Sequence, residues 1–396
     1  MPVSRPIARD ARGVIPRGRC IGPLAESRVG RNPSLEHIAG GAGRHRTEAD
    51  RANTETFDMI LLTGGAGYIG SHVCVALLDA GLDVIAVDNL SNSNKQSLER
   101  VQSICGRSPI FRQADIRNEE AIYEILRAWD VTAVIHLAGL KAVGDSNLRP
   151  LTYYENNVLG TMRLVSAMNR AKVKTLVFSS SATVYGMPAY LPLDEKHPLG
   201  PTNPYGRTKL FIEEMLKDLY RSDDDWRIGI LRYFNPVGAH ESGLIGEDPL
   251  GVPNNLLPLV AQVAVGKRER LLIWGNDYDT PDGTGIRDFI HVVDLASGHL
   301  SVLRYLKEPG VLTVNLGTGN GSSVLEVVRT FQAVSGRPVP YEIGERRAGD
   351  VAICYAAPML ASKALGWKSA RSLEQMCEDH WRWQLKNPDG YRGARF

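Results

Sequence analysis

From residue 59 onward, short runs of aliphatic and β-branched residues alternate with longer stretches in which apolar positions recur every three or four residues. The short runs are typical of buried strands, and the longer stretches are typical of amphipathic helices. We predict strands at residues 60–63, 84–87, 133–137, 175–179 and 228–233. We predict helices at residues 69–80, 118–128, 152–171 and 204–220. This alternation predicts an α/β fold of Rossmann type, with a doubly wound parallel sheet.

The pattern changes after about Pro236, where Pro, Gly and Asn cluster through residues 236–285. Such clusters are typical of loops and short elements. We therefore predict a first domain over residues 59–236 and a smaller C-terminal α/β lobe over 237–396. Two later apolar runs, 289–293 and 314–316, fit either the sheet or the lobe.

Residues 1–58 differ from the rest of the chain, with ten arginines, no lysine, seven carboxylates and no sustained apolar period. This composition predicts little stable structure. We interpret the segment as a dispensable leader, or as the product of an upstream translation start with Met59 as the working one. A basic tail that binds a partner and an Arg-rich transit signal are alternatives, although transit signals are poor in acidic residues.

The charge balance excludes two classes of partner. With 46 basic and 44 acidic residues the formal net charge is +2, which implies no field strong enough to recruit nucleic acid or an anionic membrane. The sequence contains no run of about 18 apolar residues, so it predicts no membrane-spanning helix. The cysteines are odd in number and form no CxxC pair, which argues against a disulfide framework or a zinc site and favours the reducing cytoplasm. They are Cys20, Cys74, Cys105, Cys354 and Cys377.

A glycine motif follows the first predicted strand. Gly64, Gly67 and Gly70 have GxxGxxG spacing where a strand must turn tightly into a helix. Such a turn presents backbone amides to a pyrophosphate at the positive end of the helix dipole. Asp88 closes the second strand, where a carboxylate accepts hydrogen bonds from ribose hydroxyls and repels a 2′-phosphate. Strand, glycines and Asp88 together predict a dinucleotide site that prefers NAD to NADP.

Further candidates follow two other strands, at the edge where parallel strands line a ligand crevice. They are Asp115 and Ile116, and then Leu137, Ala138, Gly139 and Lys141. Asp115 is placed to face an adenine and Lys141 a phosphate or a ribose. Either residue is equally compatible with a solvated loop charge.

The strand at 175–179 leads to Ser181, and Tyr205 and Lys209 lie four residues apart on a predicted helix, where they share one face. A tyrosine has a pKa near 10, so it removes a proton near neutral pH only where its phenolate is favoured. A nearby ammonium and a pyridinium both favour the phenolate. Together with the glycine motif, these residues predict a hydride-transfer site. Alone, a YxxxK spacing more often marks an ordinary amphipathic helix.

These motifs resemble the extended short-chain dehydrogenase/reductase family. The closer resemblance, over residues 59–391, is to its UDP-glucose 4-epimerase branch. It is carried by four segments: SSSATVYG at 179–186, PYGRTK at 204–209, LRYFNPVGAH at 231–240 and PNNLLP at 253–258. The related 4,6-dehydratases carry an acidic pair where this chain has Ala182 and Thr183, and without those acids water elimination lacks its proton donors.

The resemblance implies an isomerase of galactose metabolism that holds NAD and interconverts UDP-glucose and UDP-galactose through a 4-ketose. It implies Tyr205, Lys209 and Ser181 as catalytic residues, which also touch the cofactor. It adds to the predicted NAD contacts Tyr68, Ile69, Asn89, Asn156 and Phe234. It implies as UDP-sugar contacts Lys141, Ser181, Thr183, Tyr205, Asn235, Asn254, Asn255, Leu256, Leu272, Trp274, Arg287, Arg347, Asp350 and Cys354. No metal is implied.

One departure from the family concerns substrate size. Where some bacterial members place a tyrosine beside the sugar, RRAGDVAIC at 346–354 puts Cys354. The smaller side chain predicts room for a C2 substituent, so that UDP-GlcNAc and UDP-GalNAc are accepted as well. The alternative is a buried cysteine that serves as a small apolar filler.

Two rival functions stay open. One is another nucleotide-sugar enzyme of the same fold, such as a dehydratase or a decarboxylase, and the other is a binding module that senses NAD without turnover.

The resemblance also implies a homodimer through helices near 152–171 and 204–220. Val158, Met162, Val165 and Met168 form an apolar stripe there, but core packing would give the same stripe.

Overall fold

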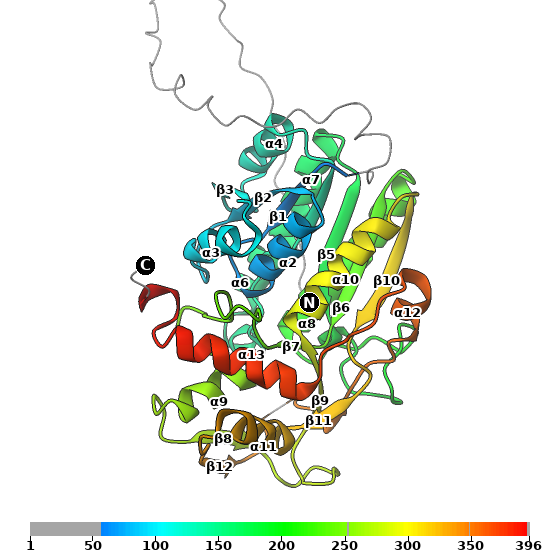
Figure 1. Cartoon of the computed structure of the whole chain (residues 1–396). Coiled ribbons are helices and arrows are strands. Elements are labelled where there is room, and N and C mark those ends of the chain that lie inside the picture. The colour runs from blue at the N-terminus through cyan, green and yellow to red at the C-terminus, as the bar shows by residue number, and fades with distance from the viewer. Residues whose placement is uncertain (1–56, 252, 348, 394–396) are drawn as a thin grey trace, which may run out of the picture. The chain divides into compact units, whose positions relative to one another are not determined.

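The computed structural model describes residues 57–251, 253–347 and 349–393. Its centre is a seven-stranded parallel sheet with the strand order β10-β6-β5-β4-β1-β2-β3 (Figure 1). The strands are β1 (Met59–Thr63), β2 (Asp83–Asp88), β3 (Ile110–Gln113), β4 (Ala133–His136), β5 (Thr175–Ser181), β6 (Arg227–Tyr233) and β10 (Gly310–Leu316). The predicted fold class is confirmed, and each of the five predicted strands is present.

Helices cover both faces of this sheet, so its strands are continuous apolar runs instead of alternating ones. In β1, Ile60 and Leu62 pack into the core on one face and Leu61 into the core on the other. The first face is covered by α2 (Tyr68–Asp79), α3 (Gln96–Cys105) and α10 (Val292–Tyr305). The second face is covered by α4 (Glu119–Ala128), α7 (Gly160–Arg170) and α8 (Pro204–Ser222). Figure 1 shows α2 and α10 side by side on the first face.

The later part of the chain builds two small sheets. One has four strands, β7 (Asn235–Val237), β9 (Ile286–His291), β11 (Gly321–Ser323) and β13 (Ile353–Cys354). The other pairs β8 (Leu271–Trp274) with β12 (Tyr341–Gly344). Leu271, Ile273 and Phe331 belong to a separate core beneath them. The helices around these sheets are α9 (Leu256–Ala264), α11 (Val324–Ser335), α12 (Met359–Leu365) and α13 (Leu373–Lys386).

The two ambiguous apolar runs belong to different parts of the fold. The run at 289–293 ends β9 and begins α10, while the run at 314–316 lies in β10 and pairs with β6. The chain thus leaves the central sheet after β6 and returns to it through α10 and β10. β7 spans the predicted boundary at residue 236, and the division into two domains stays a prediction.

The predicted helix at 152–171 is helical but interrupted. It consists of α6 (Pro150–Tyr153), a π-helical turn η1 (Tyr154–Leu159) and α7, and it follows α5 (Val143–Leu148). A π-turn adds one residue to a helical repeat and shifts the face that the following residues present. Apolar spacing alone does not show such an insertion.

Phe57 and Asp58 were expected within the unstructured leader but are part of the fold. Phe57 is buried in the core, and the Asp58 carbonyl accepts a hydrogen bond from the Asp83 amide. The rest of the leader prediction, including Cys20, lies outside the described residues. Within the described ranges, no helix is both long enough and apolar enough to cross a membrane.

Candidate active site

A cavity of about 600 Å³ opens at the carboxyl ends of β1, β2 and β4. This is the place where the strand order reverses direction between β1 and β4, and such a point forms a ligand crevice in open α/β sheets. The predicted cofactor residues that line it are Gly64, Gly67, Tyr68, Ile69, Gly70, Asp88, Asn89, Ile116, Leu137, Ala138, Gly139, Lys141 and Asn156. Most of the cofactor site predicted from sequence is thus one continuous surface.

The glycine turn is built so that no side chain fits within it. Gly64 has φ +69°, and a Cβ on Gly70 would lie 2.1 Å from the Gly64 carbonyl oxygen. Helix α2 begins after Gly67 with no side-chain cap and no acidic residue in its first turn. The first amides of a helix have no intrahelical acceptor, so this end of α2 offers free donors and a positive dipole end to an anion.

Asp88 is held in place by its surroundings. Its carboxylate accepts hydrogen bonds from the Ala66 amide at 3.1 Å, the Leu90 amide at 2.8 Å and the Ser93 hydroxyl at 2.8 Å. Asp115 does not line the cavity. It pairs with Arg117 and accepts a hydrogen bond from Asn89, and the Arg117 guanidinium lowers the pKa of Asp115 to about 2. Asp115 therefore fixes Asn89, which does line the cavity.

Ser181, Tyr205 and Lys209 come together where the end of β5 meets the start of α8. Helix α8 begins with Pro204 at its first position, and the Asn203 side chain caps it by accepting from the Gly206 amide at 2.9 Å. Lys209 donates from Nζ to the Ser179 carbonyl oxygen at 2.6 Å. The Ser181 side chain lies near the Tyr205 phenol and favours its ionised form.

Burial opposes charge on both α8 residues. It raises the pKa of Tyr205 to about 12, although the nearby Ser181 side chain works in the other direction. It lowers the pKa of Lys209 to about 7. A base at Tyr205 thus needs positive charge beyond Lys209 to ionise near neutral pH.

These three residues border the cavity but do not line it. A Cβ on Gly139, which does line the cavity, would lie 3.8 Å from Lys209 Nζ, and the cavity wall includes Ser179. Phe234, also predicted to touch the cofactor, is instead buried in an apolar cluster with Tyr185.

The predicted sugar-nucleotide residues are more scattered, and among them only Lys141 and Asn254 line the described cavity. Arg347 and Asp350 pair with each other at 3.0 Å. Arg287 on β9 is the strand partner of Cys354 on β13. The others are Asn235 on β7, Asn255 and Leu256 at the start of α9, the partly exposed Leu272 and Trp274 on β8, and Thr183, whose hydroxyl donates to Ser181 Oγ.

The model of the NAD dependent epimerase/dehydratase family matches residues 60–317. The chain belongs to this family. The UDP-glucose 4-epimerase of Bacillus subtilis (strain 168) is 56% identical over 336 residues, which are 85% of this chain and 99% of that protein. The human UDP-glucose 4-epimerase is 55% identical over 342 residues, 84% of this chain and 98% of that protein.

The chain is also similar to a solved structure. The UDP-glucose 4-epimerase from Bifidobacterium longum, in complex with NAD+ and UDP, superposes with a TM-score of 0.82 at 50% identity. The match covers 84% of this chain and 99% of that one. The family resemblance seen in the sequence motifs is thereby confirmed.

Two residues that the sequence did not single out shape this epimerase-family site. Glu247 is almost fully buried, pairs with Lys141 at 3.1 Å and accepts from Asn255 at 2.6 Å. Asn157, next to the cavity residue Asn156, clamps the backbone of Leu140 from both sides, accepting from its amide at 2.8 Å and donating to its carbonyl at 2.9 Å. The adjacent Asn156 and Asn157 are unusual inside an amphipathic helix, and this could have marked Asn157 as a functional residue. No sequence feature near Glu247 predicted its pairing with Lys141.

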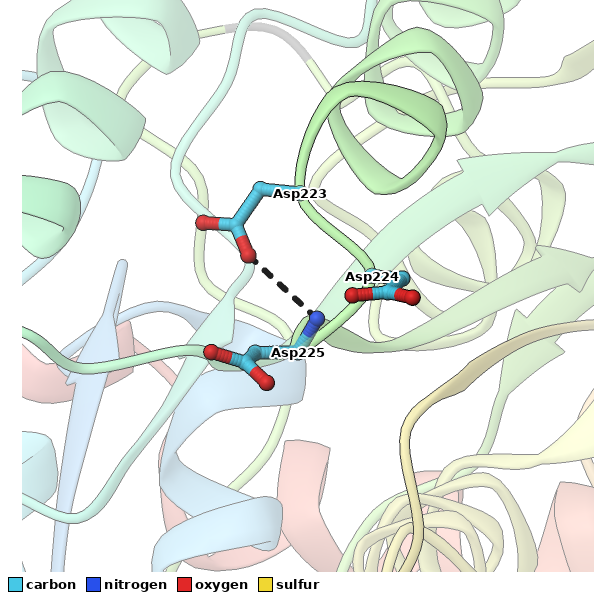
Figure 2. Close-up of side chains that lie close together, drawn as sticks. All are labelled: Asp223, Asp224 and Asp225. Carbon is cyan, nitrogen blue, oxygen red and sulfur yellow. Dashed lines mark hydrogen bonds between the residues drawn. The ribbon is translucent and has the colours of Figure 1, made fainter.

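Three consecutive acids after α8 form a cluster that could be taken for a metal site. Asp223, Asp224 and Asp225 lie close together in a turn, where the Asp225 amide donates to Asp223 (Figure 2). Lys174 Nζ lies 2.9 Å from Asp223 and 2.7 Å from Asp225. Because this ammonium already pairs with two of the three carboxylates, we assign the cluster no metal.

Gly70→Ala is expected to weaken NAD binding by roughly 10-fold or more, because its Cβ cannot coexist with the Gly64 carbonyl and overpacking of this kind costs about 1–3 kcal/mol. Calorimetric titration of the purified apoprotein with NAD measures the effect. Gly144→Ala, where a Cβ meets open space, is the control. Equal affinities of the two variants would contradict the role of this turn.

Proposed function

We propose that the chain is a UDP-glucose 4-epimerase, which interconverts UDP-glucose and UDP-galactose through a 4-keto intermediate while NAD stays bound. The observation that carries the proposal is the junction of Ser181, Tyr205 and Lys209 beside the dinucleotide cavity. The chain is also 55–56% identical to UDP-glucose 4-epimerases over most of its length.

The cavity residues fit NAD. The uncapped start of α2 is placed to bind the pyrophosphate, Asp88 to accept from the adenosine ribose hydroxyls, and Lys141 to reach a phosphate or ribose oxygen. Bound NAD supplies a hydride acceptor that returns the hydride, together with a positive charge on its nicotinamide ring. We assign the remaining cofactor contacts, including Asn89, Asn156 and Phe234, on the family resemblance.

Tyr205 is the proposed base. It takes the proton from the sugar 4-hydroxyl as C4 is oxidised, and it returns the proton when C4 is reduced on its opposite face. Ser181 shares a hydrogen bond between the phenol and the substrate hydroxyl. Lys209, held on the Ser179 carbonyl, adds the positive charge that favours the phenolate against the effect of burial.

The lobe residues are the proposed UDP-sugar contacts. Arg287 and Arg347 carry the charge that suits a pyrophosphate, and Asn235, Asn254 and Asn255 offer neutral hydrogen bonds to sugar and base. We add Thr183, Leu256, Leu272, Trp274 and Asp350 on the family resemblance. Glu247 connects this set to the cofactor side, because it holds both Asn255 and Lys141.

The two rival functions are less well supported. Ala182 and Thr183 provide no acid at the positions where the dehydratases carry theirs, so elimination of water has no proton donor there. A module that only senses NAD has no need for a base, an ammonium and a serine gathered in one place.

Tyr205→Phe is expected to lower the turnover of UDP-galactose by roughly 10²- to 10⁴-fold, because the general base is lost. Purified protein is incubated with UDP-galactose and no added NAD, and the products are separated by chromatography. Tyr190→Phe, an exposed position, is the control. Near-normal turnover by Tyr205→Phe would remove Tyr205 from this role, and a deoxy sugar or carbon dioxide among the products would favour a rival enzyme.

We also propose that N-acetylated sugars are substrates. Burial raises the pKa of the Cys354 thiol to about 11, so the side chain is small and neutral at physiological pH. It packs against an apolar cluster that includes Phe234 and Ala356. This packing is compatible with a filler role, so substrate tests are needed to separate the two interpretations.

The wild-type protein is expected to convert UDP-GalNAc to UDP-GlcNAc. Cys354→Tyr is expected to reduce this conversion at least roughly 10-fold more than that of UDP-galactose, because a bulky ring removes the volume for the acetamido group. Cys354→Ala, which keeps the volume, is the control. Failure of the wild type to act on UDP-GalNAc while it consumes UDP-galactose would contradict the argument.

A homodimer is the proposed assembly. Of the apolar stripe seen in the sequence, Val165 and Met168 are buried in the core and Val158 packs against it, so core packing accounts for these three. Met162 is 50% exposed. Other apolar side chains lie exposed on the same group of helices, namely Leu148, Leu151, Leu159 and Phe211.

Phe211→Asp is expected to convert a dimer to a monomer, because burying an unpaired carboxylate in an apolar contact costs more than the roughly 2–7 kcal/mol of a neutral polar group. Light scattering coupled to gel filtration measures the mass. Met359→Asp, an exposed methionine on α12, is the control. A monomeric wild type, or a Phe211→Asp variant that stays dimeric, would contradict this interface.

The cytoplasm is the proposed location. Within the described ranges the cysteines are free thiols, and Cys74 and Cys377 are buried. Free thiols of this kind are compatible with a reducing compartment.

A further inference from the structure

Helix α8 carries a further buried polar residue on the face of Tyr205 and Lys209. Glu213 lies four residues beyond Lys209, and its side chain has no exposure to solvent. Its carboxylate accepts from Arg232 on β6 at 3.0 Å through Nε and at 2.7 Å through Nη2. It also accepts from the Ser180 hydroxyl at 2.5 Å. Neither the sequence motifs nor the proposed mechanism uses this residue.

Three consecutive serines at the end of β5 lie against Tyr205, Lys209 and Glu213 of α8. The Ser181 side chain lies near Tyr205, the Ser180 hydroxyl donates to Glu213, and the Ser179 carbonyl accepts from Lys209. Ser180 therefore stands between the two serines that meet the catalytic residues. A shift of this strand end relative to α8 would disturb both neighbouring contacts.

We propose that Glu213 is a positioning residue, which acts through Ser180 to hold Ser181 and Tyr205 in register and which places a negative charge near the Lys209 ammonium. This inference rests on the proposed function, because it concerns the base of that reaction. Glu213 itself does not line the cavity.

The charges around Lys209 support this role. Its neighbours are Tyr205 and Glu213 on α8, His136 on β4 and the Phe178 ring on β5, 4.8 Å from Nζ. Burial lowers the pKa of His136 to about 3, so this imidazole is neutral at pH 7. Burial lowers the pKa of Lys209 to about 7, and the Glu213 carboxylate opposes that change.

Tyr233 on β6 completes the surroundings. Burial raises its pKa far above the usual value, so it adds no negative charge near pH 7. Among the groups named here, Glu213 is thus the anion that favours the protonated amine.

Arg232 extends the same network to the loop after Ser181. Its Nη1 donates to the Tyr185 hydroxyl at 3.1 Å and to the Glu195 carbonyl at 3.4 Å. The Tyr185 hydroxyl in turn donates to Asn315 on β10 at 2.6 Å. One buried ion pair therefore connects α8, β5, β6 and β10 with the turn that carries Ser181.

Stability alone is a weak reason for such a pair. Removing two charges from water costs much of what their attraction returns, and apolar replacements of similar volume are often neutral or stabilising. A role in fixing the charge state and the position of catalytic groups would explain why this buried pair is present.

The test compares Glu213→Gln with Glu214→Gln. Gln at 213 can still accept from Ser180 but has no charge, and Glu214 is an exposed residue on the same helix that pairs with Lys217. Both variants are assayed on UDP-galactose with bound NAD across the pH range. For Glu213→Gln we expect kcat to fall about 10-fold or more with KM changed less than about 2-fold.

The pH profile separates positioning from a merely structural role. Lys209 without its anion loses its proton at lower pH, so the alkaline limb of kcat should move down by about one pH unit. Tyr205 then needs higher pH to ionise. Its phenolate absorbance in the holoenzyme, taken as the difference from Tyr205→Phe, should appear at higher pH. A lower kcat with both titrations equal to those of Glu214→Gln would overturn the proposal.

A second variant covers the case in which Glu213→Gln fails to fold because Arg232 is left unpaired. Glu213→Gln with Arg232→Met removes both buried charges, and it is expected to fold and to show the same displaced limb and phenolate titration. Unchanged titrations in this folded double variant would equally overturn the proposal. If the wild type fails to act on UDP-galactose, the proposed function fails, while the phenolate titration still decides the effect of Glu213 on Tyr205.

Discussion

The hydrogen bond from the Lys209 ammonium to the Ser179 carbonyl joins helix α8 to the end of β5 inside the protein, away from bulk water. A cation without water must be held by fixed acceptors and nearby charge, which constrains everything around it. The backbone of β5 has to end where it does, α8 has to begin at Pro204, and the first turn of α8 has to bring Tyr205 to Ser181. The same exclusion of water that lowers the pKa of Lys209 makes any charge nearby more effective.

The residues proposed to bind NAD and those proposed to bind the UDP-sugar are joined by Glu247. Glu247, from the segment that precedes α9, reaches Lys141 beyond β4 and Asn255 at the start of α9. The nearly buried Glu247 carboxylate thus joins two segments that are distant in sequence, and the Lys141 side chain remains partly exposed.

The features predicted from sequence are those set by local pattern. Strands buried on both faces are continuous apolar runs, the glycines mark a turn that admits no Cβ, and Tyr205 and Lys209 share a helix face by spacing alone. What escaped prediction depends on partners distant in sequence or on helix geometry. The pairing of Glu247 with Lys141 and the buried pair of Glu213 with Arg232 leave no periodic signal. The π-turn at Tyr154–Leu159 leaves no mark in the apolar spacing, and the run at 314–316 fitted either the sheet or the lobe, so its place in β10 stayed open.

The late return of β10 to the sheet has a consequence for synthesis on the ribosome. β6 has β5 on one side from the start, but its other edge finds its partner only after the whole of β7 to α10 has been made. Until residue 316 leaves the exit tunnel, the nascent chain exposes an open edge at β6, so the central sheet is completed only when most of the polypeptide has been made.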